Sequence, residues 1–351
     1  MKTKNIPKIL LALTLIFLVS CSKSEENVPL TGPTAQITVE KIVRKASLRN
    51  QDIPFRILNE NGDDVTDITT FFVDGVEITG SNFSSDVIGD FEVYGVYTEN
   101  GVEITTNVEP FKVIIPKRKV VIEDYTGTWC GFCPSVAAAI IDTHELTEHL
   151  AIVAIHETAN SSPDPYHYNE FPILRNAFNI GGLPRARINR TVPWVSPYTS
   201  NDIVAMAGQD TNLAIGIVSE LAGTTLTVKV DMVFETGTQA GDKLVLYLIE
   251  NGIIYKQTNY YNDDPSSPYY QLGNPILEFE HNEVLRQSLT QTLGNTIGAA
   301  GPLEEIGMTF AAEIPEDYDT NNLELVAMIV DVDNNARNAQ TAHINVDQEY
   351  Q

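Results

Sequence analysis

The 351-residue chain is poor in cysteine, tryptophan and basic residues. It has only three cysteines, so its cores must be held by apolar burial and not by a framework of disulfides. Its 22 lysines and arginines face 47 aspartates and glutamates, a net charge of −25, which argues against nucleic-acid binding. We interpret the acidic balance as a solubility device. The one long apolar run, Ile9–Val19, is shorter than the roughly 20 residues that span a bilayer.

The N-terminal segment has the features of an export signal. Residues 1–20 combine a lysine-containing start with a short apolar stretch. Leu18-Val19-Ser20-Cys21 resembles the bacterial lipoprotein box, which implies cleavage before Cys21 and a lipid anchor on that residue. An ordinary secretory signal with an incidental cysteine remains the alternative. Ser22–Glu26 resembles the surface-export tether of Bacteroidetes lipoproteins, which implies an outer membrane protein at the cell surface, with the periplasmic face left open.

The mature chain is long enough for two or three domains. We predict a multidomain α+β protein: an immunoglobulin-like β-sandwich, then a thioredoxin-like α/β domain, then a C-terminal β-sandwich. The predicted bounds are 1–20 for the signal, 21–35 for a tether, and 36–116, 117–210 and 211–351 for the three domains.

The first predicted domain shows hairpin signals. Asn61-Gly62, Asp74-Gly75 and Asn100-Gly101 are each flanked by β-forming residues. Gly89–Tyr97 alternates apolar and polar residues and resembles the penultimate strand of bacterial immunoglobulin-like modules. We therefore predict a sandwich without a disulfide.

The remaining chain changes its periodicity twice. Apolar runs at 120–122 and 151–155 predict buried strands, and helical spacing predicts helices over 133–148 and 171–178. Strands alternating with helices predict a parallel sheet core. Beyond about residue 212 the pattern becomes all-β, with a strict period of two between Leu226 and Phe234.

Cys130-Gly131-Phe132-Cys133 is the strongest chemical signal in the chain. A lone Cys-x-x-Cys pair in an exported protein is a candidate dithiol or disulfide centre. If Cys130 lies in the first turn of a helix, the helix dipole lowers its thiol pKa and favours the attacking thiolate. Cys133, one turn later, can then close the Cys130–Cys133 disulfide. The sequence leaves three readings open: redox exchange, a structural disulfide, and metal binding with His144 or His156, for which two thiolates alone are too few ligands.

The surroundings of this pair resemble the active-site segment of thioredoxins over Asp124–Cys133 and again at Gly182-Leu183-Pro184. The resemblance implies that Cys130 attacks, Cys133 resolves and Asp124 carries protons. It further implies that Trp129, Leu183 and a cis Pro184 contact the substrate, which would be a thiol- or disulfide-containing envelope protein. No cofactor or metal is predicted.

A second resemblance runs from about residue 120 to the end of the chain. Glu123–Pro134, His156 with its Asp164-Pro165-Tyr166 loop, Ile188-Asn189-Arg190 and His281–Arg286 are similar to the twenty-eight-kilodalton outer-membrane-protein family of Bacteroidetes lipoproteins. This likeness implies a surface adhesin or receptor of unknown ligand, in which the cysteine pair is a scaffold element.

Three weaker signals remain ambiguous from sequence. His156 is either a ligand at a strand end or a surface histidine. His281–Arg286 is interpreted as a hydrogen-bonding node, and Arg190 as a structural clamp. The tyrosine-rich segment around Asn262–Pro265 is interpreted as a solvated loop, with carbohydrate or calcium contact as the alternative.

Overall fold

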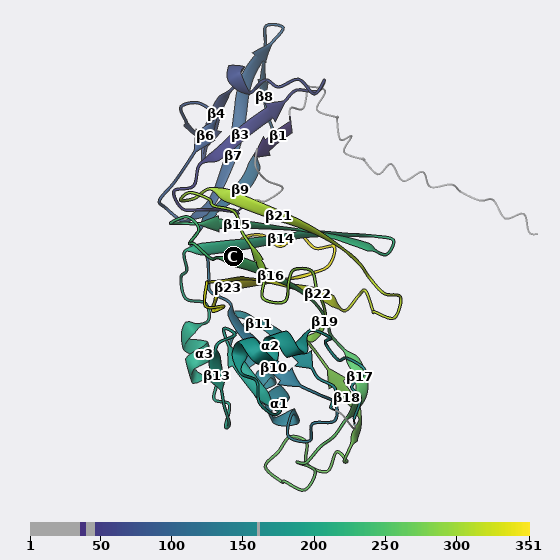
Figure 1. Ribbon diagram of the computed structural model, residues 1–351. Helices are drawn as coiled ribbons and strands as arrows, with labels where there is room; N and C mark the ends of the chain where they lie inside the picture. The colour runs from purple at the N-terminus through teal and green to yellow at the C-terminus, as the bar shows by residue number, and fades with distance from the viewer. Residues whose placement is uncertain (1–35, 40–45, 160–161) are drawn as a thin grey trace, which may run out of the picture. The chain divides into compact units, whose positions relative to one another are not determined.

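The computed structural model describes residues 36–39, 46–159 and 162–351 (Figure 1). Strands dominate this part of the chain, and its helices are short: η1 (Thr66–Ile68), α1 (Pro134–His144), α2 (Phe171–Phe178) and α3 (Asn201–Met206). The lipid-anchor prediction at Cys21, the leader and the tether lie outside the described residues. No helix among the described residues is long and apolar enough to cross a membrane.

The N-terminal part consists of two sheets. One has the strand order β1 (Gln36–Val39), β3 (Ile53–Leu58) and β6 (Asn82–Phe83). The other has the order β2 (Ala46–Leu48), β9 (Glu109–Ile114), β7 (Gly89–Glu99), β4 (Thr70–Val73) and β5 (Val76–Glu77), with β8 (Val102–Thr105) paired to β7. Aromatic and aliphatic side chains from both sheets form one core, including Phe55, Phe71 and Phe111.

Two of the predicted hairpins are confirmed. Asp74 and Gly75 both have positive φ and join β4 to β5, and Asn100 and Gly101 do the same for β7 and β8. Positive φ at both central residues produces the turn twist that antiparallel strands require. Asn-Gly and Asp-Gly pairs adopt it at little cost, so these turns follow from sequence alone.

A nine-stranded sheet dominates the rest of the chain. Its strand order is β13 (Val192–Trp194), β12 (Arg185–Ile188), β10 (Val120–Thr126), β11 (Leu150–His156), β19 (Val284–Ser288), β16 (Lys243–Glu250), β22 (Leu323–Val330) and β23 (Ala336–His343), with β20 (Asn295–Thr296) paired to β16. The prediction of a thioredoxin-like α/β domain followed by a separate C-terminal sandwich is therefore wrong. The strands assigned to the two domains form one continuous sheet, and the described chain is mostly β.

The expected parallel core is also mostly absent from this sheet. β10 and β11 are parallel over their whole length, and β11 meets β19 in parallel at Ala154 and Val284. β12 runs antiparallel to β10, and β16, β22 and β23 form an antiparallel series. Sequence periodicity distinguishes buried from half-buried strands but does not say which distant strand pairs with which. The insertion of β19 beside β11 was therefore invisible in the sequence.

The two faces of the nine-stranded sheet have different covers. On one face, Phe171, Leu174 and Phe178 of α2 pack against apolar side chains of β10, β11, β16 and β22. On the other, Val136 and Ile140 of α1 pack over β10, β11 and β12. The same second face continues onto a three-stranded sheet, β14 (Leu213–Ala222), β15 (Thr225–Phe234) and β21 (Glu305–Glu313). Figure 1 shows α1 and α2 beside β10.

β15 confirms the strict alternation read from the sequence. Its five apolar positions from Leu226 to Phe234 are completely buried, and they pack with Leu244, Leu246 and Leu248 of β16. All residues of β16 and β22 except Lys243 and Glu324 are buried, which explains their nearly continuous apolar sequences, because both faces of these strands are covered.

A buried ion pair ties the loop after β12 to the sheet. Arg190 Nε donates to Glu123 Oε1 at 2.9 Å, and both side chains are fully buried. Tyr125 Oη donates to the other carboxylate oxygen at 2.7 Å, and the Arg190 guanidinium lies 4.8 Å from the Phe178 ring centroid. The interpretation of Arg190 as a structural clamp is confirmed. The next residue, Asp124, is also buried, on the opposite face of β10.

Candidate ligand-binding site

Cys130 and Cys133 form a disulfide with an S–S distance of 2.04 Å. The pair lies in the turn between β10 and α1, and the helix begins only at Pro134, a residue type well suited to the first helical position. Cys133 is therefore the N-cap of α1, and Cys130 precedes the helix. The premise that Cys130 occupies the first helical turn, where the dipole acts most strongly on its thiol, is wrong.

The segment Gln257–Tyr260, at the end of β17 (Ile253–Gln257), covers the disulfide. Gln257 Nε2 donates to the carbonyl of Cys130 at 2.9 Å, and the backbone of Tyr260 donates to the carbonyl of Gly131 at 2.9 Å. An added Cβ at Gly131 would lie 2.4 Å from the Tyr260 ring, so glycine is required for this close approach. Cys130 and Cys133 are consequently only 4% and 2% exposed.

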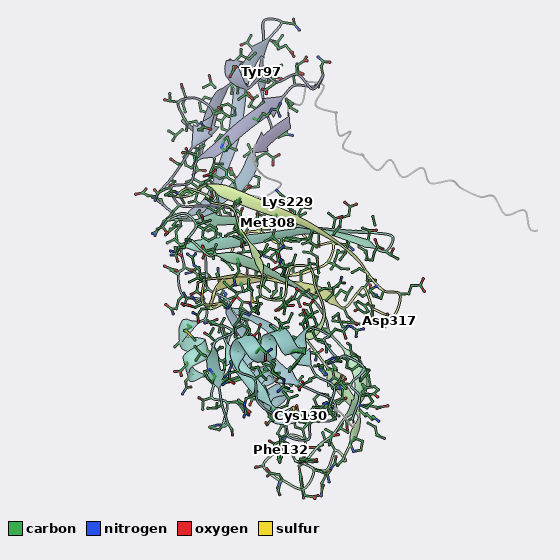
Figure 2. The ribbon with its side chains drawn as sticks, viewed as in Figure 1. Tyr97, Cys130, Phe132, Lys229, Met308 and Asp317 are labelled. Carbon is green, nitrogen blue, oxygen red and sulfur yellow. A yellow bond between two sulfur atoms is a disulfide. The ribbon has the colours of Figure 1, made fainter. Side chains whose placement is uncertain are left out.

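Phe132 is the exposed member of the motif. It is 54% exposed, and its ring meets Tyr260 edge-on with centroids 5.0 Å apart. Figure 2 labels Cys130 and Phe132 beside the loop that follows β17. The exposed part of the motif is therefore the Phe132 ring in contact with Tyr260, whereas both cysteines are buried.

The other predicted contact residues are held in different ways. Trp129 Nε1 donates to the carbonyl of Glu157 at 2.6 Å, so the indole N–H is already hydrogen-bonded within the chain. The Leu183–Pro184 peptide bond is cis, as expected. Pro184 precedes β12, whose Ala186 pairs with Asp124, so the register puts this bend beside the end of β10. Both residues of the bend are half-buried.

Asp124 lies on the face of β10 that α1 covers and is 4% exposed. Its Oδ1 is buried without a hydrogen-bond partner. Burial, and secondarily the Glu283 carboxylate, raises the pKa of the Asp124 carboxyl well above its usual range. A buried carboxyl group left unpaired is costly.

Asp124 and Cys133 line one cavity of about 410 Å³, within the size range of small-molecule sites. Its walls come from α1, from the strand ends of β10 and β11, and from the hairpin of β17 and β18 (Ile276–His281) with its connecting loop. The apolar part of the wall includes Ile140, Ile141 and Ile276. The predicted proton-carrying carboxyl and the second cysteine therefore do lie on a common cavity.

His156 and His281 bring two distant signals of the sequence to this cavity. Their ring centroids are 5.5 Å apart, and both side chains line it. His156 Nδ1 lies 3.1 Å from Asp164 Oδ2, in a pair that is almost fully buried. Burial opposes ionisation of Asp164, but bonds from His156 and from the backbone of Thr128 and Tyr166 outweigh it and lower its pKa.

His281 is a neutral imidazole. Burial, with His156 nearby, lowers its pKa to about 3. A hydrogen bond to the backbone of Tyr255 favours a proton on one ring nitrogen, while Nε2 is buried without a partner. In a neutral imidazole with one nitrogen donating, the other nitrogen is an acceptor. His281 Nε2 is therefore an unused acceptor on a residue that lines the cavity.

Glu283 adds a second titratable carboxyl. Burial first, then the carboxylates of Glu324 and Glu280, raises its pKa to about 7. His144 Nε2 on α1 lies 3.8 Å from Glu283 Oε1. Val284, next to Glu283, pairs with Ala154, which in turn pairs with Asp124, so the strand register groups these acids.

The hairpin side of the cavity was missed by sequence reasoning. The tyrosine-rich segment is solvated as predicted, with Asp263 and Pro265 exposed, but its base is anchored: Asn259 is fully buried, and its side chain donates to the carbonyls of Tyr269 and Gly273. The run His281-Asn282-Glu283 was the only sequence signal, and nothing in it indicated proximity to Cys133. In the described part of the chain, no group of three or more histidine, cysteine or acidic residues is arranged to hold a metal ion.

No curated protein matches the chain. Two solved structures have low similarity: the surface layer protein SbsC, domains 4–9, at 12% identity and TM-score 0.16, and a β-glucosidase from Kluyveromyces marxianus in complex with glucose, at 9% and 0.18. The alignments cover 90% and 86% of this chain but only 51% and 46% of those chains, about half their length. TM-scores this low do not indicate a shared fold.

The outer membrane protein Omp28 family matches residues 173–348, which is half of the chain. The match includes the hairpin that covers the disulfide and most strands of the nine-stranded sheet. The chain therefore belongs to the Omp28 family of outer membrane proteins, and its location is the outer membrane.

Proposed function

We propose that this outer membrane protein is a ligand-binding receptor in which the Cys130–Cys133 disulfide is a structural cross-link. The observation that carries the proposal is the cover over the sulfur atoms. Thiol–disulfide exchange requires in-line approach of a partner sulfur. Cys130 and Cys133 are 4% and 2% exposed, and hydrogen bonds of Gln257 and Tyr260 hold the cover in place.

The cavity beside the disulfide supports the receptor part of the proposal. It is of ligand size and is lined by Asp124 and His281, each of which has a buried polar atom that no described residue satisfies. Buried polar groups are normally hydrogen-bonded, and exceptions indicate strain or function. The disulfide joins Cys130, in the turn after β10, to Cys133, the N-cap of α1, and α1 forms one wall of this cavity. In this role the cross-link fixes the N-terminal end of that wall.

A Cys133→Ser variant tests the role of the disulfide, because it keeps Cys130, the attacking sulfur of the exchange alternative, and removes the sulfur that would release a mixed disulfide. We expect it to capture no envelope protein as a mixed disulfide through Cys130, and we expect the wild-type protein to show no insulin reduction above the rate of dithiothreitol alone. A known thiol–disulfide oxidoreductase serves as the positive control. Insulin reduction at a rate comparable with that control would overturn the structural role.

Membrane attachment through a lipid on Cys21 is a further part of the proposal. The lipoprotein-box resemblance and the family's outer membrane location support it. A Cys21→Ser variant should leave the membrane fraction, and mass spectrometry of the wild-type N-terminus should find an acylated cysteine. Retention of the variant in the outer membrane would contradict lipid anchoring.

A further inference from the structure

The cavity presents hydrogen-bond acceptors without donors to satisfy them. Asp124 Oδ1 and His281 Nε2 are both buried without a partner, on side chains that are 4% and 5% exposed. The two residues come from different strands: Asp124 lies on β10, and His281 ends β18. Two different elements therefore each contribute a residue with an unpartnered acceptor to the wall of one cavity.

The charge around this space is one-sided. Glu278, Glu280 and Glu283 line the cavity with Asp124, and the described residues that line it include no lysine or arginine. After burial, Glu283 adds to the electrostatic cost of ionising Asp124, and Glu280 adds to that of ionising Glu283. A cation in the cavity would remove that cost and would supply the missing donors.

The shape of the wall narrows the class of cation. Ile140, Ile141, Leu272 and Ile276 give one part of the lining an aliphatic surface. The acids are not arranged as a metal-ligand group in the described chain. An ammonium group has three N–H donors and no acceptor, which suits a site made of acceptors, and an attached alkyl chain suits the aliphatic wall.

We propose that the cavity binds a primary alkylammonium group, with its nitrogen between Asp124 and His281 and its methylene chain along α1. The proposal rests on the receptor function above and names its ligand class. The ammonium belongs either to a free alkylamine or to a lysine side chain of a peptide, because the two present the same chemistry.

Proton release is the characteristic signature of this binding mode. Glu283 has a pKa of about 7, and that of Asp124 is also raised. A bound cation lowers both pKa values, so protons leave the site at neutral pH. The observed binding enthalpy will then depend on the ionisation enthalpy of the buffer.

The test is isothermal titration of the detergent-solubilised full-length protein at pH 7. The probes are n-pentylamine, its neutral analogue 1-pentanol, and Nα-acetyl-lysine methylamide. We expect n-pentylamine to bind at least about tenfold more tightly than 1-pentanol, a difference of about 1.4 kcal/mol, with net proton release. Binding of the lysine derivative as tightly as n-pentylamine assigns the site to peptides, and binding of n-pentylamine alone assigns it to free amines.

Matched variants locate the binding. Asp124→Asn should weaken n-pentylamine binding at least tenfold, and Glu283→Gln should reduce both affinity and proton release. Asp142→Asn, an exposed acid on α1 that does not line the cavity, should change neither. Equal affinities for amine and alcohol, or undiminished binding in both cavity variants, would overturn the proposal.

The outcome is separable from that of the receptor proposal. Failure of both amines to bind, with the disulfide still inert toward exchange, overturns only the ligand class. Exchange activity at the disulfide overturns the structural role of the cross-link, whatever the amines do.

Discussion

Replacing Glu283 with glutamine should remove a pH-dependent penalty from the folded protein. Burial and two neighbouring carboxylates raise the pKa of Glu283 from 4.5 to about 7. Each pKa unit corresponds to about 1.4 kcal/mol, so the full shift amounts to roughly 3 kcal/mol. A quarter of the side chain (25%) is exposed, and solvent screening reduces the expected effect to about 2 kcal/mol.

The sign follows from proton binding. Between pH 4.5 and about 7 the folded state holds the Glu283 proton more tightly than the unfolded state does. The contribution of Glu283 to stability is therefore fully present below pH 4.5 and is lost as the pH rises to about 7. The other titratable groups that face it are His144, Asp124, Glu280 and Glu324.

The assay is urea unfolding of wild type and Glu283→Gln at pH 4, 5.5, 7 and 8.5. The variant should gain about 2 kcal/mol relative to wild type between pH 4 and pH 8.5. Glu220→Gln, an exposed acid on β14, is the control and should show no such trend. A wild-type-to-variant difference that stays constant across this range would refute the assignment of a raised pKa to Glu283.

Three further predictions concern the framework. Arg190→Met should cost about 3–5 kcal/mol because it leaves Glu123 buried and unpaired, and adding Glu123→Gln should restore part of this in chemical denaturation. Gly131→Ala should destabilise the segment that covers the disulfide by about 1–3 kcal/mol, because the added methyl overpacks against Tyr260. The double variant Gly131→Ala with Tyr260→Ala should relieve this clash. Equal rates of disulfide reduction in Gly131→Ala and wild type would contradict the prediction. Phe171→Ala should cost about 3–5 kcal/mol, because the fully buried ring packs on Tyr125; a loss below 1 kcal/mol in urea unfolding would refute its place in the core.

The sequence predicted local structure well where one short-range signal decides it. The Asp74-Gly75 and Asn100-Gly101 hairpins follow from positive-φ preferences, and β15 follows from strict alternation. α2 has the predicted bounds of residues 171–178, because its apolar spacing fits the helical period.

Long-range pairing could not be predicted in this way. The sequence of β19 is short and unremarkable, yet its place between β11 and β16 merges the expected α/β domain with the C-terminal strands. The cavity could not be predicted for the same reason, because it depends on which distant strands pair. Asp124 and Cys133 were candidates from the start, but His281 and Glu283 join them only through the pairing of Val284 with Ala154.

The most direct test of the structural role of the disulfide is its reduction rate by dithiothreitol in the native protein, compared with the rate in urea. With the cover of Gln257 and Tyr260 in place, reduction requires local opening, which we expect to slow the native reaction by about a hundredfold or more. Equal rates in the native and unfolded protein would contradict a buried cross-link and would restore thiol exchange as the function of Cys130 and Cys133.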